Sequence, residues 1–220
     1  MTVSYEQRQY AVPEDATEVV LVRHGASAAA VPGETHEILE GRGNPPLSPT
    51  GVQQAEAVAE RLAREPLVRI FTSTLQRTAE TAAPLVRRTG LEPVAIADLA
   101  EVSLGDWEGG EFRIRAYQGD PLVMRALREE RWDVLPGAET MEDFAERVRR
   151  GIAEVVALSG PGVSVAAFVH GGVIAELCRV ATASRPFAFL RNDNTNVTRI
   201  VVHPDGTLFL RSFNDITHLA

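Results

Sequence analysis

Short apolar runs that alternate with amphipathic stretches are the feature that most limits the folds open to this chain. Residues favouring strands are concentrated at Glu18–Arg23, Val68–Thr72, Val163–Val169, Val197–His203 and Thr207–Phe213, with a weaker run at Pro93–Ala97. The first run is apolar without alternation, so we expect a strand that is buried on both faces. A run of this length is far too short for the roughly 20 residues of a membrane helix.

Helical periodicity fills the gaps between these runs. We expect helices at Pro49–Arg64, Leu75–Thr89, Thr140–Leu158 and Gly172–Ala181. Strands that alternate with helices predict an α/β fold with a mostly parallel sheet. The last two strands are joined across Pro204-Asp205-Gly206, which predicts a hairpin and therefore an antiparallel edge.

Three of these helices carry start signals. Ser48 precedes Pro49 as an expected cap, and the buried face of that helix is expected to hold Val52, Ala55, Ala59 and Leu62. Ser73 with Gln76, and Thr140 with Asp143, are spaced as capping boxes.

Composition excludes several kinds of chemistry. All 22 basic residues of the 220-residue chain are arginine, so no lysine is present for a Schiff base, a pyridoxal site or a Walker A loop. The formal net charge of −8 argues against nucleic-acid binding. Cys178, the single cysteine, forms no internal disulfide and is expected in the core. We expect one domain over residues 1–220, no metal and no cofactor.

The compartment follows from what the chain lacks. The segment Met1–Glu14 has neither a basic start nor an apolar run, so no signal peptide is expected. With no membrane-length apolar stretch either, we expect a soluble cytoplasmic protein without membrane partners.

Two of the predicted strands end on histidine and glycine. The first ends on Arg23-His24-Gly25, and the run at Val163–Val169 ends on His170-Gly171-Gly172, where a helix follows at once. Arginine offers a fork of donors to phosphate oxygens, an unprotonated imidazole can attack phosphorus, and a helix N-terminus binds anions. Because ligands bind at the carboxyl ends of parallel strands, we expect both histidines in one anion site.

Two further residues are candidates for that edge of the sheet. Arg77 opens the helix after Val68–Thr72, where its charge opposes the helix dipole unless an anion is bound. Glu101 follows the weak strand, and a carboxylic acid there can protonate a leaving oxygen. Spacing alone leaves three other acids open for that role, namely Asp98, Asp106 and Glu108.

Taken in order, six segments resemble the histidine phosphatase superfamily, in its phosphoglycerate mutase-like branch. They are Arg23-His24-Gly25-x-Ser27, Leu47-Ser48-x-x-Gly51-x-x-Gln54-Ala55, Ser73-x-Leu75-x-Arg77-Thr78-x-x-Thr81-Ala82, Glu101-x-x-x-Gly105-x-Trp107-Glu108-Gly109, Pro136-Gly137-x-Glu139-Thr140 and His170-Gly171-Gly172. The resemblance implies a three-layer α/β/α sandwich without a metal. It also implies that His24 is the phosphorylated nucleophile and Glu101 the proton donor, with a phosphate pocket formed by Arg23, Arg77, His170, Ser27 and Gly171.

The chain departs from that pattern around the pocket rim. Ala30 stands where relatives commonly carry asparagine, and Glu34 and His36 in the long following loop are interpreted as exposed polar residues rather than substrate contacts. A segment at about 109–138 is expected to form a lid, in which Arg113 and Arg115 are candidates for catching an anionic substrate. Trp107, Tyr117 and Trp132 either wall the pocket or pack.

This lid is shorter than in glycolytic mutases and lacks their lysine, which favours hydrolysis over transfer. We therefore predict a phosphomonoesterase for a small phosphorylated metabolite. The alternatives are a mutase primed by 2,3-bisphosphoglycerate and a catalytically weak binding or regulatory protein. The final hairpin leaves pairing into a homodimer open.

Overall fold

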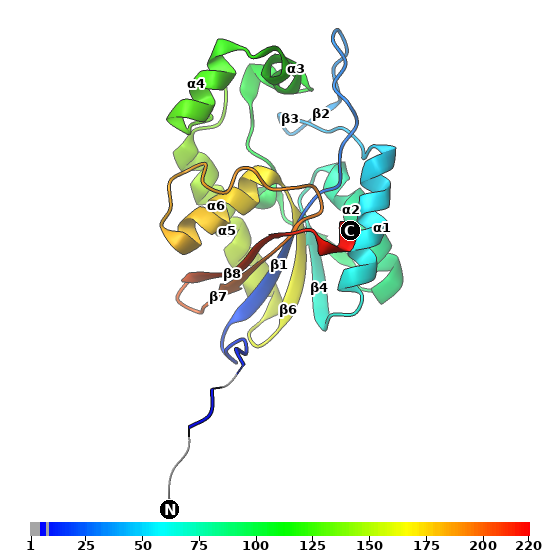
Figure 1. Ribbon diagram of the computed structural model, residues 1–220, viewed down its shortest axis with the longest axis vertical. Helices are drawn as coiled ribbons and strands as arrows, with labels where there is room; N and C mark the ends of the chain where they lie inside the picture. Colours follow the sequence, from blue (N-terminus) through cyan, green and yellow to red (C-terminus); the bar gives the residue numbers. More distant parts are fainter. Residues whose placement is uncertain (1–4, 8) are drawn as a thin grey trace, which may run out of the picture.

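A six-stranded sheet forms the centre of the computed structural model, which describes residues 5–7 and 9–220 (Figure 1). Its strands run in the order β5-β4-β6-β1-β7-β8. Neighbours from β5 to β1 are parallel, whereas β7 and β8 are antiparallel to their neighbours. The strands are β1 (Thr17–Arg23), β4 (Leu67–Thr72), β5 (Pro93–Ala95), β6 (Ser164–Val169), β7 (Val197–Val202) and β8 (Leu208–Asp215). The predicted α/β sheet with an antiparallel edge is confirmed.

Helices cover both faces of this sheet, as the predicted three-layer arrangement requires (Figure 1). One face is covered by α1 (Pro49–Leu62) and α2 (Gln76–Thr89), and the other by α5 (Met141–Ser159) and α6 (Gly171–Thr182). Beyond the carboxyl ends of the parallel strands lie α3 (Glu111–Gln118), α4 (Pro121–Glu129) and a small hairpin of β2 (Ile38–Leu39) and β3 (Arg42–Gly43). Three short 3₁₀ turns complete the elements, at Ala97–Leu99, Gly105–Trp107 and Thr217–Leu219.

The central strand β1 shows why both layers are needed. Val20 and Val22 pack with α1 and α2 in one core cluster, whereas Val19 and Leu21 face α5 and α6 in the other. All four side chains are fully buried, because successive residues of a strand point to opposite faces. The absence of alternation in this run therefore has the predicted cause.

The capping predictions have mixed outcomes. Ser48 Oγ accepts a hydrogen bond from Gly51 N at 3.1 Å, and Thr140 Oγ1 accepts one from Asp143 N at 3.0 Å. The capping box at Ser73 is wrong: α2 begins at Gln76, and its N-cap residue Leu75 makes no side-chain cap. The first N–H of this helix is instead capped by Asn44 Oδ1 at 2.9 Å, from a loop far away in sequence, which no local pattern predicts.

The buried face of α1 is also rotated relative to the predicted one. Val52 is exposed, although Ala55, Ala59 and Leu62 are buried as expected. Gly51 occupies the buried end of the stripe because a Cβ atom there would lie 2.1 Å from Ala26 O. Close approach of two backbones therefore sets the face of α1, in place of a larger apolar side chain.

The remaining local predictions agree with the structure. The β7–β8 hairpin turns at Asp205, whose carboxylate accepts a hydrogen bond from Thr207 N at 2.9 Å. Cys178 is fully buried, and burial raises the pKa of its thiol to about 12.

Across the described residues, no helix is long and apolar enough to cross a bilayer. The prediction about a signal peptide concerns residues 1–14, of which 1–4 and 8 lie outside the described part.

Candidate active site

Two neighbouring strands bring the predicted histidines together, and a third brings Arg77 to the same edge of the sheet. β1 pairs in parallel with β6, and Arg23 lies opposite Val169, so His24 and His170 emerge side by side at the carboxyl edge. Their ring centroids are 5.2 Å apart, with the planes inclined by 61°. On the other side of β6, Ser73 follows β4 and α2 then begins, which places Arg77 at the same edge.

His24 is held as a neutral imidazole with a defined tautomer. Its Nδ1 atom lies 2.8 Å from Gly25 O, and because a carbonyl only accepts, Nδ1 carries the hydrogen. Burial, together with the guanidinium groups of Arg77 and Arg23, holds the pKa of His24 well below its usual range. The lone pair is therefore on Nε2, and His24 is one of the residues that line the pocket.

His170 is fixed from the opposite direction. Its Nε2 atom lies 2.8 Å from Ser73 Oγ, while its buried Nδ1 atom has no hydrogen-bond partner among the described residues. Burial is the main reason that the pKa of His170 is well below its usual value, and the nearby Arg77 lowers it further.

Two arginines supply the charge of the site, the buried Arg77 and the half-buried Arg23. Arg77 Nη1 donates to Gly43 O at 2.9 Å, and burial lowers the pKa of Arg77 to about 10, so the group is still charged at neutral pH. Arg23 Nη1 donates to Asn192 O, and its buried Nε has no partner in the described part of the chain. Burial also lowers the pKa of Arg23. An unpaired Nε and an unpaired Nδ1 beside two guanidinium groups indicate an anion site.

Glu101 points its carboxylate at the beginning of α6. Gly172 N donates to both of its oxygens at 3.2 Å, and Val102 N donates to Oε1 at 3.1 Å. A Cβ atom on residue 172 would lie 2.4 Å from Glu101 Oε1, so only glycine allows this approach. The acid therefore lies at a helix N-terminus, next to the histidine that precedes it.

The four acids that spacing left open are separated by the structure. Glu101 and Glu108 line the pocket that holds His24, whereas Asp98 and Asp106 do not. Main-chain donors occupy both oxygens of Glu108, as they do those of Glu101; the donors to Glu108 are Gly43 N and Leu104 N, each at 2.7 Å. Asp98 instead pairs with Arg150 at 3.0 Å.

The pocket extends well beyond the anion site and has a volume of about 750 Å³. Arg23, His24, Ser27, Arg77, Glu101 and Gly171 line its inner end. The outer part is lined largely by apolar and aromatic side chains, among them Leu104, Trp107, Phe112, Tyr117, Trp132 and Leu190. The space is wide enough for an organic group much larger than a phosphate.

A sequence profile of the histidine phosphatase superfamily, branch 1, matches residues 19–215. The chain belongs to the histidine phosphatase superfamily. It is 31% identical over 206 residues to a protein of Mycobacterium tuberculosis named as bifunctional, covering 92% of this chain and 55% of that one. The chain thus spans about half the length of the mycobacterial relatives that it matches over this region.

Other relatives in this superfamily bear the names of phosphatases. A metal-independent phosphoserine phosphatase of Arabidopsis thaliana is 28% identical over 213 residues, covering 95% of this chain and 86% of the relative. The solved structure of a mycobacterial glucosyl-3-phosphoglycerate phosphatase superposes with a TM-score of 0.72 at 30% identity, covering 90% of this chain and 99% of the other. These two relatives are named for different substrates, phosphoserine and glucosyl-3-phosphoglycerate.

Some rim residues of this member of the histidine phosphatase superfamily lie elsewhere than predicted. His36, interpreted as exposed loop polarity, lines the pocket. Arg113 also lines it and donates to Ser27 Oγ at 2.9 Å and Ala28 O at 2.8 Å. Arg115 is turned away from the pocket, because it pairs with Glu111 at 2.6 Å and covers the Trp107 ring.

Sequence reasoning missed several residues that support the site. Ser73 is predicted to be a helix cap, but it contacts His170. The sequence predicts no role for Asn44 and Arg42 in the long loop, although Asn44 caps α2 and Arg42 binds the Glu101 main chain. Asn192 was also missed; its main-chain oxygen binds Arg23. Only Ser73 had a usable signal, its place in a segment that resembles the superfamily. In the described residues, no group of three or more His, Cys, Asp and Glu is placed to hold a metal ion.

Proposed function

We propose that this protein hydrolyses a small phosphate monoester through a phosphohistidine intermediate on His24, with Glu101 as the proton donor. The observation that carries the proposal is the tautomer of His24. Since Nδ1 donates to Gly25 O and burial keeps the ring neutral, Nε2 carries the lone pair, and His24 lines the same pocket as Arg23 and Arg77.

The phosphate would be bound by the unpaired donors of this space. Arg23 Nε and His170 Nδ1 are both buried and have no hydrogen-bond partner among the described residues, and a phosphate oxygen would satisfy each. In a phosphoryl transfer the charge is spread over three equatorial oxygens, so two guanidinium groups and a neutral imidazole donor suit the transition state. Ser27 and Gly171 line the same pocket.

Glu101 gives a proton in the first chemical step and takes one back in the second. In the first, Nε2 attacks phosphorus, the bond from phosphorus to the leaving oxygen breaks, and the Glu101 carboxylic acid gives its proton to that oxygen. In the second, the Glu101 carboxylate takes a proton from water, the water oxygen attacks phosphorus, and the phosphorus–nitrogen bond breaks to restore the imidazole. No other group has to accept or supply a proton.

The outer pocket favours a leaving group with an apolar or planar part. Phe112 and Trp132 meet edge to face at 5.9 Å and, with Leu190, line this outer part. We propose that segment 109–138, which holds α3 and α4, acts as a lid on the leaving group. The Arg113 contact with Ser27 ties this lid to the loop that follows His24.

The test is turnover of an aryl phosphate in the presence of a chelator and without bisphosphoglycerate. We expect the wild-type protein to be active and His24→Ala to be inactive, and we expect an acid-labile, alkali-stable phosphoprotein in a rapid acid-free quench of the wild type. Equal activity in His24→Ala would refute the proposal. Turnover that appears only after addition of bisphosphoglycerate and phosphoglycerate would indicate a mutase instead.

A further inference from the structure

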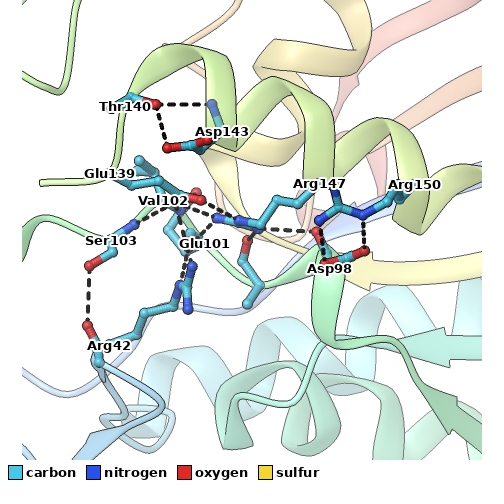
Figure 2. A network of polar contacts seen from close by, with 12 residues as sticks. Arg42, Asp98, Glu101, Val102, Ser103, Glu139, Thr140, Asp143, Arg147 and Arg150 are labelled. Atoms are coloured by element: carbon cyan, nitrogen blue, oxygen red, sulfur yellow. Dashed lines mark hydrogen bonds and ion pairs between the residues drawn. The ribbon is translucent and has the colours of Figure 1, made fainter.

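The main-chain oxygen of Glu101 accepts hydrogen bonds from two arginines on different elements (Figure 2). Arg42 Nε, from β3, lies 2.6 Å from this oxygen, and Arg147 Nη2, from α5, lies 2.9 Å from it. A carbonyl oxygen has two lone pairs, so both are used by guanidinium donors. Hydrogen bonds to charged donors are stronger than those between neutral groups.

The carboxylate of Glu139 binds both of these arginines. Glu139 Oε1 lies 2.6 Å from Arg147 Nε, and its Oε2 lies 2.8 Å from Arg147 Nη2 and 3.4 Å from Arg42 Nη2. The three side chains are only 9%, 12% and 17% exposed for Arg147, Glu139 and Arg42. Burial raises the pKa of Glu139, but the hydrogen bonds and charge of Arg147, the Ser103 N–H and the charge of Arg42 together hold that pKa below its usual value, so the group is a carboxylate.

The same side chains also bind the peptide groups on either side of Glu101. Arg147 Nη1 donates to Asp98 O at 3.0 Å and to Ala100 O at 2.6 Å, and Glu139 Oε2 accepts from Ser103 N at 3.1 Å (Figure 2). Residues 100–104 belong to no helix or strand, so no backbone ladder fixes their place. These side chains hold the segment together with two further contacts, from Glu139 N to Ser103 O at 2.9 Å and from Leu104 N to Glu108 Oε1 at 2.7 Å.

We propose that Arg42, Glu139 and Arg147 are positioning residues that hold the Glu101 main chain, and through it the Glu101 carboxyl group, against the phosphate site. We call these three residues the Glu101 clamp. This inference rests on the proposed role of Glu101 as the proton donor. It also gives a physical reason for the segment Pro136-Gly137-x-Glu139-Thr140, whose Glu139 carries the carboxylate of the clamp.

The proposed reaction depends on the exact position of the Glu101 carboxyl group. A general acid acts only within hydrogen-bond reach of the atom that it protonates, about 2.6–3.2 Å. A misplacement of about 1 Å can cost on the order of a hundredfold in rate. Because residues 100–104 lack regular structure, loss of a clamp bond lets the carboxyl group drift from the leaving oxygen without changing the phosphate ligands.

The experiment compares two phosphate esters that differ in their need for a proton. A nitrophenyl ester has a stable phenolate leaving group and needs little protonation, whereas glycerol phosphate releases an alkoxide and depends on the donor. The kcat/KM value is measured for both, because it reports the steps up to loss of the leaving group. The variants are Arg42→Gln and Glu139→Gln, with Glu101→Gln as the reference for a lost donor.

The control is Arg150→Gln, which lies on the same helix as Arg147 and binds Asp98 by its side chain without contacting Glu101. Arg147→Lys is added to retain the charge at the most buried position. Circular dichroism and thermal melting are recorded for each variant. Arg42 lies on a two-stranded hairpin and also lines the pocket, whereas Glu139 does not line it, so Glu139→Gln tests the clamp away from the bound ester.

We expect Arg42→Gln and Glu139→Gln to lower kcat/KM for glycerol phosphate at least about tenfold more than for the nitrophenyl ester. Glu101→Gln should show the same selectivity with a larger loss, and Arg150→Gln should show neither. Equal losses on both esters in the clamp variants, with selectivity retained by Glu101→Gln, would overturn the clamp alone. Absence of selectivity in Glu101→Gln would overturn the donor role itself, and the clamp with it.

Discussion

The Nε2 atom of His170 lies 2.8 Å from the Oγ atom of Ser73, which joins the carboxyl ends of β6 and β4 across the floor of the site. Ser73 Oγ also accepts from Leu75 N at 3.2 Å, and Thr78 Oγ1 lies 3.1 Å from it. This hydroxyl group therefore orients the His170 ring, whose Nδ1 atom is buried and has no hydrogen-bond partner among the described residues.

Replacement of Ser73 by alanine should leave His170 Nε2 unpaired. A buried group without its partner costs about 1–3 kcal/mol of folding stability, which lowers the Tm, and the loss of the contact that orients the ring should also lower kcat/KM and weaken phosphate binding. The measurement is steady-state kinetics together with the Kd for inorganic phosphate. The neighbouring Thr74→Ala, which removes only an exposed hydrogen bond to Glu40, should change neither.

Removal of the Arg77 guanidinium should affect both binding and rate. Arg77→Gln takes away a charged donor that burial has already desolvated, and losing one preorganised donor of this kind costs about 10²–10³ in rate. Arg87→Gln is the matched control, because Arg87 lies on the same helix with a 63% exposed side chain. Equal activity of the two variants would contradict the assignment of Arg77 to the phosphate site.

Stability should fall as the pH drops below about 6.5. His24 and His170 have pKa values well below 6.5 in the folded protein, so between 6.5 and those values the unfolded chain binds two protons that the folded chain does not. Each group then contributes a slope of about 1.4 kcal/mol per pH unit, with stability lost toward acid.

Urea unfolding in phosphate-free buffers between pH 5 and 8 measures this slope. His170→Asn should remove about half of it, since one titrating group of the pair is lost. A slope that stays the same in this variant would show that His170 does not carry the predicted share.

Gly51→Ala should destabilise the protein through a backbone clash. The added Cβ atom would lie 2.1 Å from Ala26 O, which forces α1 away from the loop that follows His24. Overpacking of this kind costs about 1–3 kcal/mol, measured as a lower Tm and a lower urea midpoint. Thr50→Ala, one residue earlier and exposed, should leave both nearly unchanged.

Local pattern was enough for most of the architecture. The uninterrupted apolar run of β1, the Ser48 cap and the Pro204-Asp205-Gly206 turn each depend on neighbouring residues, so each could be predicted from the chain alone. The start of α2 could not, because its cap is Asn44, whose loop meets the helix only in three dimensions. The prediction that Val52 is buried was wrong for a similar reason, since a contact between Gly51 and the Ala26 backbone sets the face of α1.

Taken by itself, the sequence determined which groups are available: two histidines and an arginine at strand ends, and no amine on any side chain. Apolar periodicity requires those strands to lie in one buried sheet, so their ends had to meet. Tertiary structure alone decided how the groups are held. The tautomer of His24, the Ser73 contact of His170 and the two guanidinium donors on the Glu101 carbonyl all come from hydrogen bonds whose geometry follows from packing.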